Sequence, residues 1–175
     1  FIESRKMTID ILEKAKATGD LSIRIIHGDP KLNNILFDKT SNKAKSIIDL
    51  DTIKPGLVHY DLGDCIRSCC NPGGENPKKS SDIRFDFIQA KSLLGGYLEQ
   101  ARRFMSATDI AFIPDAIRLL PIELGIRFFT DYLLGNKYFK TQYREQNLER
   151  AQAQFLLAAD IEKKLPKLKQ LLNQL

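Results

Sequence analysis

The chain has 175 residues, of which 43% are hydrophobic and 28% charged, and its formal net charge is +5. These values are ordinary for a soluble globular domain. No apolar stretch approaches the length of a membrane span and no signal peptide opens the chain, so we expect no membrane partner. The basic residues are scattered instead of gathered in one stripe, which argues against a nucleic-acid partner.

The cysteines lie in one short stretch, at Cys65, Cys69 and Cys70. Their number is odd and two are adjacent, so a disulfide framework is not expected. Their spacing does not match that of a zinc site, and no histidine lies close by. We interpret them as reduced thiols near a buried helix face, which fits a cytoplasmic protein.

The first third of the chain alternates helical and extended patterns. Residues 2–17 have the apolar spacing of an amphipathic helix, and residues 21–26 form a short β-branched run typical of a buried strand. The segments 35–37 and 45–50 are apolar, and the polar residues 38–44 between them include several turn formers. The pattern predicts a β-hairpin.

The register of this hairpin matters because polar residues flank it. Pairing Phe37 with Ser46 brings Asn34 opposite Asp49. A loop that carries Asp29 and Asn34 would then end beside Asp49, although the register of a short hairpin can slip by a residue or two.

Helical patterns dominate the rest of the chain. Four helices are expected, over residues 59–70, 82–105, 114–134 and 146–174. The Pro- and Gly-rich residues 71–77 form a loop, and Pro121 and Pro166 should kink or split the last two helices. A small β element in a helical body favours an α+β lobe over a doubly wound sheet.

Four polar residues around the hairpin have the chemistry that phosphoryl transfer needs. Asp29 supplies a carboxylate that could orient and deprotonate a hydroxyl, and Lys31 could place a cation beside the γ-phosphate. Asn34 and Asp49 supply oxygen ligands of the kind that Mg²⁺ prefers.

The motif around these residues resembles a known family. The segment His-Gly-Asp-Pro-Lys-Leu-Asn-Asn at residues 27–34, followed by Ile-Asp-Leu-Asp at residues 48–51, is similar to the signature of the aminoglycoside phosphotransferase and choline kinase family. That family is related to protein kinases. The resemblance implies ATP and Mg²⁺ as cofactors and transfer of the γ-phosphate to a hydroxyl of a small molecule.

The resemblance also implies individual roles. Asp29 would be the catalytic base that contacts the acceptor, and Lys31 would stabilise the transferred charge. Asn34 and Asp49 would hold Mg²⁺ and, through it, the nucleotide. Two residues would be structural, namely His27 and Asp61, which would hold the catalytic loop.

One branch of the family is closer in appearance, the N-acetylhexosamine 1-kinases. Residues 48–52, 60–67 and 125–133 are similar to segments of that branch. By this resemblance Arg127 and Tyr138 would line a sugar pocket beside Asp29.

A departure from the family concerns the nucleotide. The family has an N-terminal lobe with a phosphate-covering loop and a lysine for the α- and β-phosphates, and no Gly-rich loop stands at a suitable place here. We therefore expect residues 1–175 to be the C-terminal catalytic lobe of a longer protein. Its missing N-terminal lobe would be a partner, and this piece alone would be inactive.

Other interpretations stay open at this stage. The acceptor could be choline, an aminoglycoside, homoserine or methylthioribose, and the lobe could be a catalytically silent binding module. A basic helical domain that binds nucleic acid is a third class.

Several single residues also have plain structural explanations. Arg127 could pair with Glu123 or Asp131, with Asp131 favoured, and Tyr138 could be an ordinary core aromatic. Asp61 has the position of a helix N-cap, Arg67 could pair with Asp64, and His59 suits a surface loop.

Overall fold

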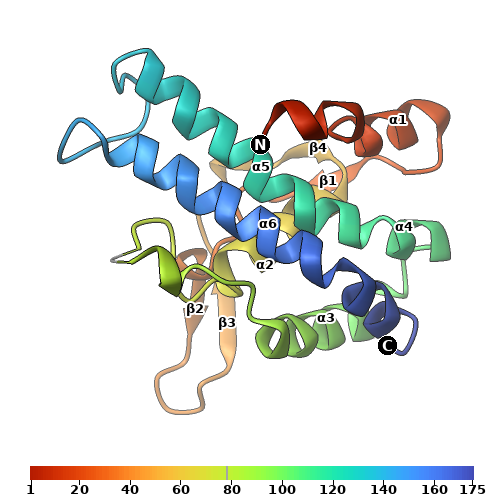
Figure 1. Cartoon of the computed structure of the whole chain (residues 1–175). Helices are drawn as coiled ribbons and strands as arrows, with labels where there is room; N and C mark the ends of the chain where they lie inside the picture. The colour runs from red at the N-terminus through yellow and green to blue at the C-terminus, as the bar shows by residue number, and fades with distance from the viewer. Residues whose placement is uncertain (78) are drawn as a thin grey trace.

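The computed structural model describes residues 1–77 and 79–175, which form a helical body with two small antiparallel sheets (Figure 1). The α-helices are α1 (Ile11–Thr18), α2 (Val58–Cys69), α3 (Phe87–Ala101), α4 (Ala107–Ala111), α5 (Ile113–Leu133) and α6 (Gln146–Leu172). The strands are β1 (Arg24–Ile26), β2 (Ile35–Phe37), β3 (Ala44–Ile47) and β4 (Lys54–Gly56). Short 3₁₀ turns are η1 (Glu3–Thr8), η2 (Leu32–Asn34), η3 (Leu50–Thr52) and η4 (Ser80–Asp82). The expected mostly helical α+β class is confirmed.

The helices α5 and α6 form the centre of the body and run side by side in opposite directions (Figure 1). Their contact is close at Gly125, where a Cβ atom would lie 2.6 Å from the ring of Phe155. The main core joins these helices to α2 and α3, with Ile117, Leu157 and Leu94 fully buried. Burial of each such side chain stabilises the fold by about 1.5–3 kcal/mol. The core therefore gives α2 a rigid backing.

The sheets lie at the edge of this body. β1 pairs with β4, with Arg24 opposite Gly56. The β2–β3 hairpin projects away from the helices (Figure 1). None of the helices in the part of the chain that is described has the length and apolarity to cross a membrane.

The hairpin register differs by one residue from the expectation. Ser46 faces Leu36, and a bulge then places Phe37 opposite Ala44. The backbone N–H of Ile48 donates to the carbonyl of Asn34 at 2.9 Å, so Ile48 takes the position that was expected for Asp49. Asp38 binds the N–H groups of Thr40 and Ser41 and fixes the turn, and Lys45 of β3 is the extra, unpaired residue of the bulge.

Several element boundaries also differ. The first expected helix is split, with η1 followed by α1, and β1 begins three residues late. The expected helix 82–105 is shorter because Asp86 caps α3 through the N–H groups of residues 88 and 89. Of the expected kinking or splitting at Pro121 and Pro166, the splitting is wrong, since α5 and α6 continue through both residues. Packing along the shared core outweighs the hydrogen bond that each proline removes.

The prediction of a surface position for His59 is wrong as well. Its side chain is 1% exposed, inside the first turn of α2. Its Nε2 lies 2.7 Å from the carbonyl oxygen of Asp109, which ties α2 to α4.

Candidate active site

The loop after β1 has a conformation that only glycine accommodates easily at its second position. Gly28 has φ of 87°, and a Cβ there would lie 2.6 Å from the carbonyl oxygen of Thr52. The His27 ring is held on both sides, because Asp29 N–H donates to Nδ1 at 3.2 Å and Nε2 lies 2.9 Å from the Ile48 carbonyl. Nε2 is thus the protonated nitrogen. The loop is tied to the hairpin through this ring.

Helix α2 binds the same loop through one side chain. The carboxylate of Asp61 accepts the backbone N–H groups of His27 at 2.7 Å and of Gly28 at 2.9 Å. Asp61 is not the N-cap that was expected, because α2 begins at Val58 and Asp61 lies in its first turn. A carboxylate in this place benefits from the helix dipole and from charge-assisted hydrogen bonds. The expectation that Asp61 holds the catalytic loop agrees with these contacts.

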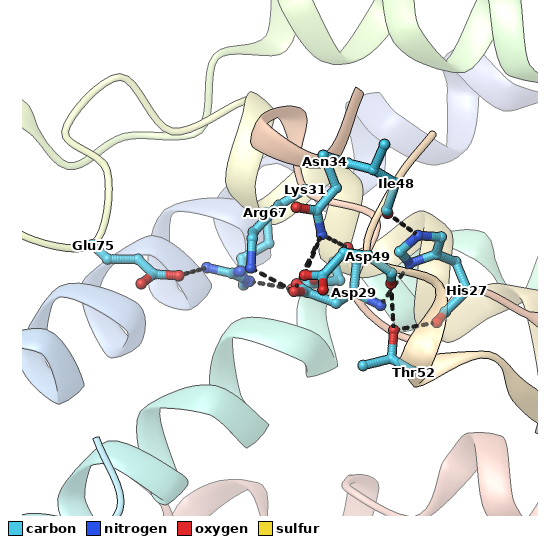
Figure 2. A network of polar contacts seen from close by, with 10 residues as sticks. His27, Asp29, Lys31, Asn34, Ile48, Asp49, Thr52, Arg67 and Glu75 are labelled. Carbon is cyan, nitrogen blue, oxygen red and sulfur yellow. Dashed lines mark hydrogen bonds and ion pairs between the residues drawn. The ribbon is translucent and has the colours of Figure 1, made fainter. Parts of the chain in front are cut away.

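Figure 2 shows the polar cluster that results. The Nζ of Lys31 lies 2.5 Å from Oδ2 of Asp29. The amide of Asn34, which is 5% exposed, donates to the Asp29 carbonyl at 2.9 Å and to Oδ2 of Asp49 at 3.2 Å. The structure thus brings together Asp29, Lys31, Asn34 and Asp49, as the sequence predicted.

The charge of Lys31 is fixed by its surroundings. The hydrogen bond with Asp29 raises its pKa, desolvation opposes this, and the charges of Asp29, Asp49 and Glu75 raise it further. The pKa of Lys31 therefore lies above its ordinary value, and the side chain is a cation at neutral pH. A cation is what a transferring phosphoryl group requires nearby.

Asp49 has a backbone conformation that is uncommon for residues other than glycine. Its φ is 68° and its ψ 50°, between β3 and η3. Asp tolerates this left-handed region better than most residues, and such strain often accompanies a functional site at a cost of about 1–3 kcal/mol. The side chain is thereby turned towards Asn34.

The donor set fits a hard divalent cation. The nitrogen of the Asn34 amide is used by Asp29 and Asp49, which leaves the amide oxygen and a carboxylate as oxygen ligands. Mg²⁺ is commonly held by one or two such protein groups together with phosphate oxygens and water. In the part of the chain that is described, no group of three or more His, Cys, Asp or Glu could hold a metal by itself.

A cleft of about 910 Å³ opens beside the cluster. Its lining includes Asp29 and Lys31 together with Arg127, Tyr138 and Phe139. The expectation that Arg127 and Tyr138 share a cavity with Asp29 agrees with this geometry. Tyr138 is 74% exposed, so the alternative that it is a core aromatic is wrong.

Arg127 does not pair with Asp131. Its guanidinium lies 3.6 Å from Glu123, one helical turn earlier, and 5.8 Å and 5.6 Å from the ring centroids of Tyr138 and Phe139. The i+4 spacing alone made both acids possible partners. The fold selects Glu123 because Asp131 points into another network.

Asp131 supports the segment that carries Tyr138. It is 5% exposed, and its carboxylate accepts the backbone N–H groups of residues 137, 138 and 139 at 2.8–2.9 Å. Asn147 on α6 donates to it at 2.9 Å. Desolvation raises the pKa of Asp131, but the three backbone donors outweigh it and the pKa is lowered. The sequence did not predict that Asp131 binds these backbone N–H groups, since no motif indicates a carboxylate that binds a loop six residues later.

A second acidic residue at the cleft was also missed. The expected pair of Arg67 with Asp64 is confirmed at 2.7 Å, and Arg67 further binds Glu75 at 3.0 Å. Glu75 comes from the loop of residues 71–77 and lines the cleft. Its position in a loop gave no periodic signal in the sequence.

Comparison with known families agrees with this arrangement. The model of the phosphotransferase enzyme family matches residues 3–91, which is half of the chain, and so the chain belongs to that family. The match covers the loop after β1, the hairpin and α2. Family membership makes a kinase-type phosphotransferase the class of this protein.

Proposed function

We propose that residues 1–175 form the C-terminal catalytic lobe of an ATP- and Mg²⁺-dependent kinase that phosphorylates a hydroxyl group of a neutral sugar such as an N-acetylhexosamine. The observation that carries this proposal is the cluster of Asp29, Lys31, Asn34 and Asp49 at the edge of a large cleft. The family match supports its phosphotransferase part.

Each residue of the cluster has one step in the reaction. Asp29 accepts the proton of the acceptor hydroxyl as the hydroxyl oxygen attacks the γ-phosphorus. Lys31, which is paired with Asp29 at 2.5 Å, moves its positive charge towards the transferred phosphoryl group once the acceptor lies against Asp29. Asn34 and Asp49 would hold Mg²⁺, which supplies charge neutralisation at the phosphates when bound.

The charges in the cleft favour a neutral acceptor. The acidic side chains that line it already have partners. Four ion-pair groups are present, namely Asp29 with Lys31, Asp64 and Glu75 with Arg67, Glu123 with Arg127, and Glu13 with Lys16. Glu13 also binds Tyr60, and Asp61 binds backbone N–H groups. Among the residues that the structure describes, basic side chains line the same cleft in equal number. Such a wall offers hydrogen bonds of both kinds but little net negative potential, which suits a polyhydroxylated molecule better than an aminoglycoside polycation.

Choline and homoserine are the other acceptors to weigh. A quaternary ammonium needs free aromatic faces, and the rings of Tyr138 and Phe139 both lie near the guanidinium of Arg127. Homoserine carries both charges, and each carboxylate that lines the cleft in the described part of the chain already has a partner for its charge or its oxygen atoms. A silent binding module is disfavoured by the complete set of Asp29, Asn34 and Asp49.

Exposed apolar residues near the cluster support the proposal of a further lobe. Five large apolar side chains between β1 and β4 are 40–70% exposed, namely Ile25, Leu36, Ile48, Leu50 and Ile53. Such groups usually mark a surface that another element or a ligand covers. We propose that the N-terminal lobe of the same protein and the base of ATP lie there.

A panel of acceptors tests the proposal. The full-length protein would be supplied with Mg²⁺ and ATP and with N-acetylhexosamines, hexoses, choline, homoserine or an aminoglycoside, and ADP release and ³¹P NMR would be recorded. We expect a sugar phosphate with an N-acetylhexosamine and none without Mg²⁺. Phosphorylation of choline or an aminoglycoside alone would refute the sugar assignment, and no turnover with any acceptor would refute the kinase assignment. Residues 1–175 alone should show little activity.

A further inference from the structure

The loop of residues 71–77 contributes Glu75 to the lining of the cleft and is held at several points. Asn71 donates its side-chain amide to the Gly74 carbonyl at 2.9 Å. Asn76 accepts hydrogen bonds through Oδ1 from Gln146 at 3.0 Å and from Arg150 at 2.8 Å, both on or beside the start of α6. The residues on each side of Glu75 are therefore held by hydrogen bonds. A residue held in this way can present its side chain in one direction.

Arg67 fixes that direction. Its side chain is 6% exposed, and it donates Nε to Asp64 and Nη1 to Oε1 of Glu75. Desolvation lowers the pKa of Arg67, but the two carboxylates outweigh it and the pKa is raised. One buried guanidinium thus binds both carboxylates, and it holds Glu75 through one carboxylate oxygen.

The two carboxylates that Arg67 binds differ in exposure. The side chain of Glu75 is 43% exposed and that of Asp64 20%. Oε1 of Glu75 is used by Arg67, and Oε2 has no hydrogen-bond partner among the residues that the structure describes. Glu75 also acts electrostatically on Lys31, so it lies near the residue that pairs with Asp29.

We propose that Glu75 is an acceptor-binding residue whose carboxylate, oriented by Arg67, accepts hydrogen bonds from hydroxyl groups of the sugar. This inference rests on the proposed function. The hydroxyl that attacks faces Asp29, while one or two others donate to Oε2 of Glu75 across the cleft. Hydrogen bonds from hydroxyls to a carboxylate are charge-assisted, and they select the position and configuration of the hydroxyls that make them.

Steady-state kinetics of Glu75→Gln in the full-length enzyme test this role. The substitution keeps the shape of the side chain and removes its charge. We expect the KM for the sugar to rise about 10- to 100-fold, the size of a lost hydrogen bond to a charged group, with kcat and the KM for ATP nearly unchanged. Glu99→Gln on α3, which is exposed and outside the cleft, is the matched control and should leave all three constants unchanged.

Deoxy analogues of the sugar separate binding from support of the loop. In the wild type, removal of the hydroxyl that meets Glu75 should raise KM, and in Glu75→Gln the same removal should cost little more. Asn76→Ala, which loosens the loop but keeps Glu75, should retain the wild-type discrimination between analogues. Equal sensitivity of Glu75→Gln and the wild type to every analogue, or an unchanged KM in Glu75→Gln, would overturn the inference and leave the proposed function intact. Absence of sugar phosphorylation by the wild type would overturn the proposed function itself.

Discussion

The side chains of Asn34 and Asp49 meet at 3.2 Å, although fifteen residues separate them in the chain. Two turns make this contact: η2, which ends at Asn34, and the left-handed backbone of Asp49 after β3. The Asn34 amide also binds the Asp29 carbonyl at 2.9 Å. One buried amide thus sets the spacing between the carboxylate proposed as base and the carboxylate proposed as metal ligand.

Replacement of Asp29 by Asn should separate chemistry from nucleotide binding. The variant keeps a polar group of the same size beside Lys31 but cannot accept the proton of the hydroxyl. We expect kcat of the full-length enzyme to fall about 10²- to 10⁴-fold, with the affinity for Mg-ATP similar to the wild type. Turnover within a few-fold of the wild type would contradict the assignment of Asp29 as base.

Replacement of Asp49 by Asn tests the metal site without disturbing the backbone. Asn tolerates the left-handed conformation at φ of 68°, so the loss of charge is isolated from strain. Titration calorimetry of the full-length protein should show loss of the Mg²⁺-dependent part of ATP binding. Asp51→Asn, two residues later, is a control expected to bind Mg-ATP as the wild type does. If Asp49→Asn binds Mg-ATP with unchanged affinity, Asp49 is not the metal ligand.

The sequence was sufficient for the cluster because its parts are local. One loop sets the spacing between Asp29 and Asn34. The β2–β3 hairpin then brings the chain back, so that Asp49 lies beside Asn34. The bulge at Phe37 escaped prediction because turn conformation, not apolar alternation, sets the register of such a short hairpin. The error of one residue did not matter, since the side chains of Asn34 and Asp49 are long enough to meet.

The remainder of the site depends on long-range packing. Arg67 holds Glu75 at the cleft, and the neighbouring Asn76 is bound by residues of α6 some seventy positions later. Asp131 binds a loop instead of Arg127 because Asn147 on α6 adds a further donor there. No periodicity in a single segment reports such contacts, which arise only when α5 and α6 pack.

Removal of the charge at Asp131 should disturb the part of the cleft lining that contains Tyr138 and Phe139. Asp131→Asn leaves one oxygen acceptor for three backbone N–H groups, so the segment that carries Tyr138 should loosen. We expect a lower Tm and a raised KM for the acceptor, with the KM for ATP unchanged. Asn147→Ala removes one of the four donors and should give a smaller effect in the same direction. Equal effects on the KM for the acceptor and the KM for ATP would mean that Asp131 supports the whole lobe and not only the segment that carries Tyr138.

Burial of His59 predicts a loss of stability in mild acid. Desolvation lowers the pKa of His59 below its ordinary value near 6.5, although the Asp109 carbonyl and charge act in the opposite direction. The folded state then binds fewer protons than the unfolded state once the pH falls below about 6.5, so the free energy of unfolding decreases as the pH falls. Urea denaturation between about pH 7.5 and 5 measures this slope. His59→Gln, which can still donate to the Asp109 carbonyl, should show a flatter profile, and an equally steep one would exclude His59 as the source.

The three thiols on and after α2 should differ in reactivity. The pKa of Cys69 is lowered, chiefly by a hydrogen bond from the Cys65 thiol and then by Ser68 and the Leu32 N–H, while desolvation and the charge of Asp64 oppose this. Burial raises the pKa of Cys70 to about 12. The thiolate is the nucleophile, so iodoacetamide at neutral pH should modify Cys69 first, as read by peptide mass spectrometry of the native protein.

Leu32, whose N–H lies near Cys69, is in the turn between Lys31 and Asn34. A bulky adduct on Cys69 would displace that turn, so we expect alkylation and loss of turnover to proceed at the same rate. Cys65→Ala should slow both, since it removes the donor with the largest effect on Cys69. Cys70→Ala should change neither rate. Equal labelling of Cys69 and Cys70 would show that the donors around Cys69 do not activate its thiol.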